Sequence, residues 1–233
     1  EAVGKRHGLA AADGRAKTGN GPHPYLRRQR YKRNWTRHTS QAIDLPGWGR
    51  QPLSGLWQTR SGVGSKMLLE LDINPLTRET FRPFGDVITA SGAETISINE
   101  GTTQRFHNLA KVDVTDEDGA TLLNIFRGQP RERPVQIRMM ERHPLGSQAF
   151  YPLKPHPYLI VTAKTEGQPT LADLRAFRAD GTQGINYAKG IWHHPLLVLE
   201  PDHDFMVIDR GGPGNNLEEY WFPETGGRAQ LTL

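Results

Sequence analysis

The pattern of apolar and polar positions changes at Met67. Before it, no sustained period of two or 3.6 residues gives a strand or a helix a face to bury. After it, short apolar runs alternate with clusters of Gly, Pro, Asn and Asp, a rhythm typical of antiparallel sandwiches and barrels. These runs predict strands at residues 68–73, 87–89, 111–114, 122–126, 135–141, 149–153, 158–163, 192–199 and 205–209. Short capped helical turns are predicted after Thr77 and Thr170, so the pattern indicates an all-β fold with few short helices.

Charge divides the chain at the same place. Residues 1–66 contain 13 Lys or Arg, three acids and ten Gly, whereas residues 67–233 contain 16 bases and 22 acids. We therefore expect residues 1–66 to be a basic, disordered extension that is not part of the native domain, and residues 67–233 to form that domain. Because Met67 is the first methionine and directly precedes an apolar run, we expect translation to begin there.

The basic segment also allows another interpretation. Its Arg and Lys residues are interleaved with Tyr25, Tyr31 and Trp35, a combination that can bind phosphates and stack on bases. We expect the extension to be dispensable instead, and expect no nucleic-acid partner.

The cysteine count and the apolar run lengths bear on the compartment. The chain has no cysteine, which excludes a disulfide scaffold and thiolate ligands and is compatible with a reducing compartment. Its longest apolar runs, such as residues 158–163, are far shorter than the ~20 residues that span a bilayer. We expect a cytoplasmic protein with no membrane partner.

The strand VQIRMMERH carries the first candidate chemistry. By the two-residue alternation of a strand, Val135, Ile137 and Met139 share one face with Glu141 and His143. A turn follows, after which Gln148 begins the next strand. This arrangement is expected to point Glu141, His143 and Gln148 into the mouth of a barrel, where small barrels hold ligands.

The segment GINYAKGIWHHPLLVLE carries the second group of candidate site residues. Its neighbours His193 and His194 are expected to point to opposite faces of a strand, so only one of them can face the cavity. Apolar residues accompany both histidines, and the alternation does not choose between them.

Together these segments resemble the paired motifs of the cupin superfamily, H-x-H-x(3,4)-E followed by G-x-x-H. The resemblance implies a cupin-like double-stranded β-helix or β-barrel, with metal ligands at Glu141, His143, Gln148 and His193. Glu141 replaces the first His of the pattern and Gln148 replaces its Glu. The remaining donor set still suits a divalent metal such as nickel, zinc or manganese, or no metal at all.

A narrower resemblance covers most of residues 67–212. The segments FRPFGDVI, INEGTTQRFHNLA, MERHPLGSQAFYPL, LRAFRADGTQGINYAKGIWHHPL and DFMVIDRGG are similar to the ureidoglycolate lyase family, in the family's order. The resemblance implies a homodimer of bicupin-like barrels that cleaves (S)-ureidoglycolate, the last ureide of allantoin degradation, to glyoxylate and urea.

Such a lyase needs one base and one acid. The substrate is a carbinolamide, whose hydroxyl loses a proton while its departing nitrogen gains one. His143 and one of His193 or His194 are the leading pair, because the pKa of histidine lies near the working pH. Lys154 is an alternative proton donor. The other interpretation of Lys154 is a solvated surface lysine without a role in the reaction.

The substrate carboxylate needs a cation in an acidic domain. Arg105 is the first candidate and Arg127 the second, since arginine offers a planar fork to carboxylates. For the urea amide, the candidates for neutral hydrogen bonds are Ser147, Gln148, Asn186 and Tyr187. Two alternatives stay open, namely a ureidoglycolate amidohydrolase that releases ammonia and a non-catalytic cupin that binds a small acid.

Overall fold

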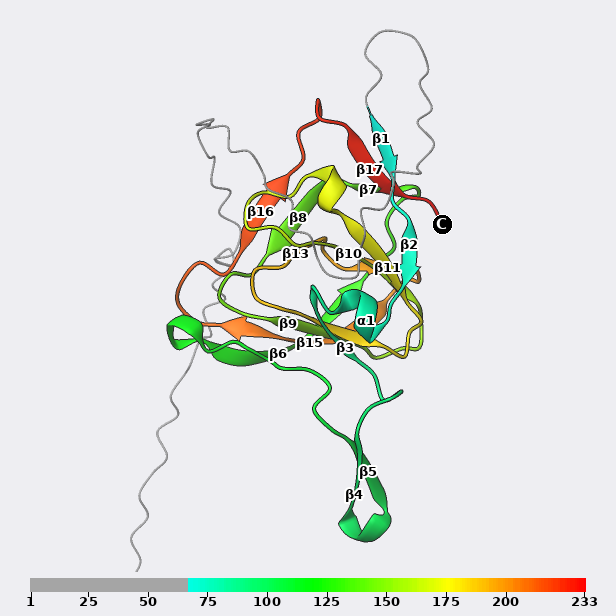
Figure 1. Cartoon of the computed structure of the whole chain (residues 1–233), viewed down its shortest axis with the longest axis vertical. Helices are drawn as coiled ribbons and strands as arrows, with labels where there is room; N and C mark the ends of the chain where they lie inside the picture. The colour runs from blue at the N-terminus through cyan, green and yellow to red at the C-terminus, as the bar shows by residue number, and fades with distance from the viewer. Residues whose placement is uncertain (1–66) are drawn as a thin grey trace, which may run out of the picture. The chain divides into compact units, whose positions relative to one another are not determined.

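The structure of the chain is a computed structural model that describes residues 67–233 (Figure 1). The predicted basic extension and the disorder expected for it lie outside the described residues. Strands dominate the described part, and the prediction of an all-β fold is confirmed. Its helices are short: α1 (Arg78–Phe81), η1 (Asn99–Gly101), η2 (Asp116–Asp118) and η3 (Leu171–Asp173). Among the described helices, none has the length and apolar character needed to cross a membrane.

Three sheets and one hairpin contain the strands (Figure 1). The three-stranded sheet runs β1 (Leu68–Glu70), β17 (Arg228–Leu231) and β7 (Val135–Ile137). The seven-stranded sheet runs β16 (Glu218–Trp221), β8 (Met139–Arg142), β13 (Trp192–His193), β10 (Tyr158–Ala163), β11 (Arg175–Ala179) and β2 (Ile73–Pro75), with β14 (Leu197–Val198) also paired to β10. The five-stranded sheet runs β3 (Gly85–Ile88), β12 (Gly184–Tyr187), β9 (Gln148–Pro152), β15 (His203–Gly211) and β6 (Ala120–Gly128). The separate hairpin pairs β4 (Thr95–Ile98) with β5 (Thr103–Phe106).

Strand β10 is the centre of the fold. All six of its residues are buried, as its uninterrupted sequence YLIVTA predicts for a strand covered on both faces. Tyr158 and Ile160 join one apolar core with side chains of the five-stranded sheet, such as Phe150 and Phe205. The alternate residues of β10 join a second core with side chains of the three-stranded sheet. The seven-stranded sheet therefore packs between the other two.

This arrangement agrees with a cupin-like fold, with one difference. The strands of residues 67–233 form open sheets and not the closed barrel that the resemblance implied. The bicupin-like arrangement stays a prediction.

Both predicted helical turns form. Thr77 caps α1, since its Oγ1 accepts a hydrogen bond from the amide of Thr80 at 3.1 Å and its own amide donates to Thr80 Oγ1 at 3.2 Å. At η3, the Thr170 amide donates to Asp173 Oδ2 at 2.8 Å. Each cap satisfies amides that the first helical turn leaves without partners.

Three predicted strands are broken in the structure. Residues 68–73 divide between β1 and β2, which pair with different sheets, and residues 135–141 divide at Arg138 between β7 and β8. Residues 192–199 divide between β13 and β14 at the segment that contains Pro195, a residue that has no amide hydrogen to donate to a ladder.

The strand predicted at residues 111–114 is wrong. This segment is held by side chains instead of a ladder: the Asp113 amide donates to Ser147 Oγ at 2.8 Å, and the Lys111 amide donates to Asp86 Oδ2 at 3.1 Å. An apolar pattern cannot distinguish such a docked segment from a strand. Six strands were not predicted at all: β4, β5, β11, β12, β16 and β17.

Candidate active site

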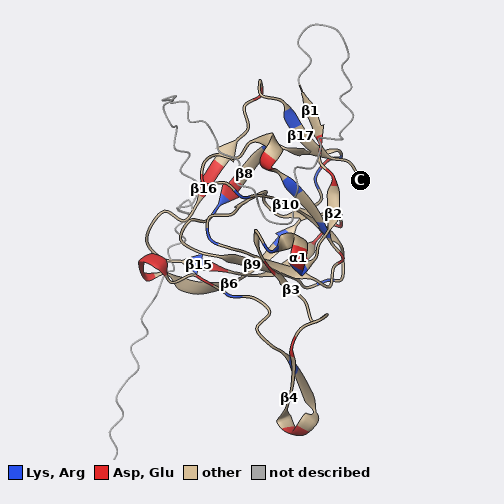
Figure 2. Cartoon of the chain, viewed as in Figure 1, with Lys and Arg blue, Asp and Glu red and all other residues tan. Residues whose placement is uncertain are grey.

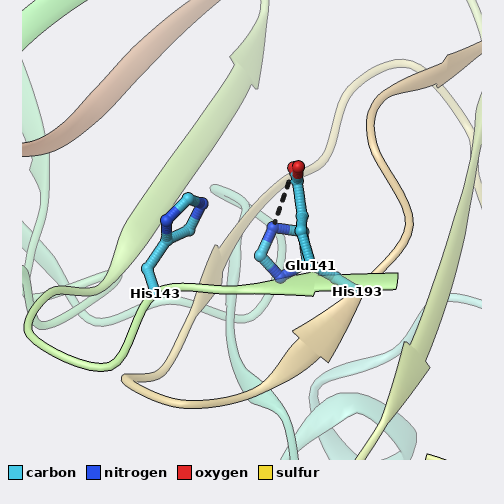
Figure 3. A group of neighbouring side chains, drawn as sticks. All are labelled: Glu141, His143 and His193. Atoms are coloured by element: carbon cyan, nitrogen blue, oxygen red, sulfur yellow. Dashed lines mark ion pairs between the residues drawn. The ribbon is translucent and has the colours of Figure 1, made fainter. Parts of the chain in front are cut away.

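Two neighbouring strands bring three titratable side chains together between the seven-stranded and five-stranded sheets. Glu141 on β8 lies directly opposite His193 on β13, and His143 follows the end of β8. Each of the three offers one ligand atom, and these atoms all lie within 4.8 Å of one another (Figure 3). We call Glu141, His143 and His193 the triad.

His143 is fixed by the backbone of a distant segment. Its Nδ1 lies 2.7 Å from the carbonyl oxygen of Asn216. A carbonyl only accepts hydrogen bonds, so Nδ1 carries the ring proton and Nε2 presents a lone pair. This Nε2 is buried and has no hydrogen-bond partner among the described residues. This Nε2 is therefore a hydrogen-bond acceptor that points into the site, and the bond from Nδ1 to Asn216 fixes the tautomer of the ring.

His193 is held in the same way and is more deeply buried. Its side chain is 2% exposed, its Nδ1 donates to the Ile191 carbonyl at 3.0 Å, and its ring stacks on Tyr187 at 4.1 Å between centroids. Burial, and then the neighbouring His143, lower the pKa of His193 to about 3. The imidazole is therefore neutral at physiological pH. Its Nε2 lies 3.6 Å from Glu141 Oε1, too far for a hydrogen bond, and has no other partner.

Glu141 is the group of the triad that can carry a mobile proton. Burial, and then the charge of Glu219, raise the pKa of Glu141 to about 7, while Arg131 acts in the opposite direction. Near neutral pH, Glu141 therefore exchanges between its protonated and ionised forms. A carboxyl group with this pKa can both donate and accept a proton.

Beside the triad lies an open cavity of about 470 Å³, within the size range of small-molecule sites. Glu141 and Gln148 contribute polar atoms to it, and Phe126, Phe150 and Leu196 form apolar walls. Gln148 begins β9 and is 7% exposed, and its Oε1 is buried without a partner. The cavity thus offers a ligand both apolar contacts and polar groups.

The donor set of the triad fits a divalent metal ion. Each histidine uses Nδ1 on a backbone carbonyl and leaves Nε2 buried and unpartnered, the arrangement in which histidines commonly bind metals. Glu141 supplies a carboxylate oxygen, and Gln148 adds an unpartnered amide oxygen at the neighbouring cavity wall. The structure thus contains a possible metal-binding triad, within the predicted set Glu141, His143, Gln148 and His193.

Of the two adjacent histidines, His193 joins the triad. Strand β13 ends at His193, and the ring of His194 turns back on its own chain, where Nδ1 donates to the Pro195 carbonyl at 2.7 Å. Both histidines border a small enclosed cavity of about 10 Å³. Burial lowers the pKa of His194 to about 4, so this imidazole is neutral as well.

Three predicted site residues are used elsewhere, and none borders the open cavity. Ser147 Oγ accepts from the amide of Asp113, and Lys154 Nζ donates to the carbonyl of Asp202 at 2.7 Å. Asn186 Nδ2 donates to Asp86 Oδ2 and to the Lys111 carbonyl. Tyr187 reaches the site through its ring, which packs flat against His193 with an interplanar angle of 12°.

The predicted arginines also have other surroundings. Arg105 lies on β5, whose four residues are all exposed, in the hairpin that extends away from the sheets and ends in an acidic turn (Figure 2). Arg127 borders the open cavity, but its Nε and Nη2 both donate to Asp204, at 2.7 and 2.8 Å. Arg131, which the sequence pattern did not single out, borders the same cavity.

Comparison with known proteins shows the family of the chain. A family model described as Ureidoglycolate lyase matches residues 68–227. Proteins named ureidoglycolate lyase are 57% identical over 155 residues in Burkholderia mallei, 52% over 162 in Brucella anthropi and 51% over 154 in Pseudomonas entomophila. The matches cover 66%, 70% and 66% of this chain and 91%, 95% and 92% of those relatives. The chain therefore belongs to the ureidoglycolate lyase family.

Proposed function

We propose that this protein is a ureidoglycolate lyase, which cleaves (S)-ureidoglycolate to glyoxylate and urea. Membership of the family supports the substrate. One structural observation supports the chemistry, namely the convergence of unpartnered buried acceptors on His143 and His193 with a partly protonated Glu141 at the edge of a cavity of ligand size. Buried acceptors without partners cost stability unless a ligand satisfies them.

In the proposed reaction His143 is the base. Its Nε2 takes the proton of the substrate hydroxyl, the electron pair of that O–H bond forms the aldehyde carbonyl, and the adjacent C–N bond breaks. The Nδ1–H bond to the Asn216 carbonyl stabilises the imidazolium that forms. This role needs no water nucleophile.

Glu141 is the acid, because its raised pKa keeps a proton available near pH 7. It donates that proton to the departing urea nitrogen. His143 then holds an extra proton and Glu141 lacks one, and their ligand atoms, within 4.8 Å of one another, are close enough for that proton to return through one bridging water. His193 is a poor donor, since its pKa of about 3 leaves it neutral. Its Nε2 serves instead as an acceptor that orients the substrate, with Tyr187 holding the ring in place.

A divalent metal such as nickel, zinc or manganese is a second form of the same proposal. Glu141, His143, Gln148 and His193 would hold it, and when bound it would lower the pKa of the substrate hydroxyl. The base would then lie outside these four residues. In the metal-free form, the buried Gln148 oxygen is suited to accept a hydrogen bond from the urea amide.

We further propose that the protein acts as a homodimer, in the cytoplasm, on the last ureide of allantoin degradation. Family resemblance supports these points. An apolar surface supports the dimer: Leu123 and Ile125 on β6 and Tyr151 on β9 are 68%, 59% and 37% exposed. In the sheet, Met206 of β15 pairs with Ile125 on one side and with Tyr151 on the other, so these three side chains share one face and the apolar surface is continuous.

Incubation of the full chain with racemic ureidoglycolate tests the proposed substrate. A chiral cavity that anchors the carboxylate and the amide presents the hydroxyl to the base in one enantiomer only. We expect glyoxylate to form until about half of the racemate is consumed, and the remainder to be a single enantiomer. No glyoxylate, with or without added nickel, zinc or manganese, would favour a protein that binds small acids without turnover.

A further inference from the structure

The substrate carboxylate restricts where its cation can lie. The carboxylate carbon is bonded directly to the carbinol carbon, whose hydroxyl must meet the acid and base. A cation that holds the carboxylate must therefore border the same cavity as Glu141 and lie close to it. The domain has an excess of acids, 22 against 16 bases from residue 67 onward, so a local positive charge is needed to bind an anion.

Among residues 67–233, two arginines border the open cavity, and they differ in their partners. Arg127 donates from Nε and Nη2 to Asp204, at 2.7 and 2.8 Å, so its charge is already paired with a carboxylate. Arg131 makes no hydrogen bond or ion pair with another residue of that range, so its charge is unpaired there. It lies in the loop between β6 and β7 and lines the same cavity as Gln148 and Glu141.

The cavity lining brings Arg131 together with the groups of the proposed chemistry. Arg131 borders the same cavity as Glu141, so a carboxylate bound by Arg131 lies in the cavity where the carbinol carbon must meet the acid. Arg105 lies on the exposed hairpin and borders neither cavity.

We infer that Arg131 is the residue that binds the substrate carboxylate, and that it makes the cavity selective for 2-hydroxy acids over their uncharged amides. This inference rests on the proposed lyase function for the identity of the substrate. It assigns the anchoring role to Arg131 instead of Arg105 or Arg127. Apolar walls formed by Phe126 and Leu196 strengthen the ion pair, because they exclude water from one side of it.

A binding experiment tests the inference without turnover. Glycolate keeps the carboxylate and hydroxyl of the substrate, and glycolamide is its uncharged counterpart. Calorimetric titration of the full chain is expected to show a preference for glycolate that Arg131→Gln reduces by roughly tenfold to a hundredfold. Glycolamide affinity should stay unchanged. Arg133→Gln is the matched control, because Arg133 is exposed, lies two residues away and borders neither cavity.

Steady-state kinetics supply the second readout. Arg131→Gln is expected to raise KM for ureidoglycolate at least tenfold and to change kcat less than about threefold, since the carboxylate keeps its charge through the reaction and its anchor contributes equally to the ground state and the transition state. Arg131 has no hydrogen-bond or ion-pair partner to lose among residues 67–233, so the variant should unfold at the wild-type temperature. An unchanged KM and an unchanged glycolate preference in Arg131→Gln would overturn the inference. A raised KM and a lost glycolate preference in Arg105→Gln instead would overturn it as well.

The two proposals fail in different ways. If the wild-type chain turns over ureidoglycolate and Arg131→Gln keeps its KM, the anchor is refuted and the lyase stands. If the chain produces no glyoxylate but prefers glycolate in an Arg131-dependent way, the anchor is supported and the lyase is refuted.

Discussion

Replacing His143 with alanine should abolish most of the activity while leaving the fold intact. The imidazole donates one hydrogen bond, from Nδ1 to the Asn216 carbonyl at 2.7 Å, and its Nε2 has no partner among the described residues. Loss of one neutral hydrogen bond costs roughly 0.5–1.5 kcal/mol of stability, and removal of an unsatisfied buried nitrogen offsets part of that. Loss of a general base costs about 10²- to 10⁴-fold in turnover, or roughly 3–5 kcal/mol in the barrier.

Two measurements separate these effects. Glyoxylate production at saturating ureidoglycolate gives kcat, and chemical unfolding gives the free energy of unfolding of the same preparation. His107→Ala is the control, because His107 is also partly buried with an unpartnered Nδ1 but lies outside the triad. A fall in kcat of less than tenfold in folded His143→Ala would refute the assignment of the base, and so would an equal fall in the control.

Two further predictions concern the extension and a buried histidine. Deletion of residues 1–66 should leave a protein that folds and keeps its kcat, because the family match covers residues 68–227; aggregation or inactivity of the shortened chain would contradict this. Burial lowers the pKa of His194 to about 4 in the folded chain, whereas an unfolded histidine binds a proton near pH 6.5. The free energy of unfolding of the wild type therefore falls as pH falls from about 6.5 toward 4. His194→Gln lacks this loss. When pH falls from about 6 to about 5, the free energy of unfolding of the wild type should therefore decrease by roughly 1 kcal/mol more than that of His194→Gln. Urea titrations that give both proteins the same pH dependence of the free energy of unfolding would exclude the effect.

The sequence was most informative where burial dictates the residue pattern. The run at β10 is apolar at almost every position because both faces of that strand are covered, and it was predicted with its observed bounds. Glu141 and His143 were predicted on one face by two-residue alternation, and the structure places them in one triad. The choice of His193 over His194 could not be predicted, since it depends on the pairing of β13 with β8 and on where β13 ends.

The missed elements share a different cause. The hairpin strands β4 and β5 are short and mostly exposed, so the signal in the sequence is weak: TISI alternates over only four residues, and TQRF does not alternate. Strand β17 pairs with β1 and β7, which are distant in the chain, and its four residues carry little local signal. Arg131 was missed for a similar reason: it lies in a polar loop, and only the fold shows that this loop borders the cavity.

Joint measurement of urea, ammonia and glyoxylate released from ureidoglycolate tests the central claim most directly. Elimination across the carbinol C–N bond leaves the ureido carbonyl intact, so urea and glyoxylate should appear in equal amounts with no ammonia. Hydrolysis at the ureido carbonyl would instead release ammonia in proportion to glyoxylate. Equal urea and glyoxylate from the wild type, with both lost together in His143→Ala, is the predicted result, and ammonia that rises with glyoxylate would contradict the lyase.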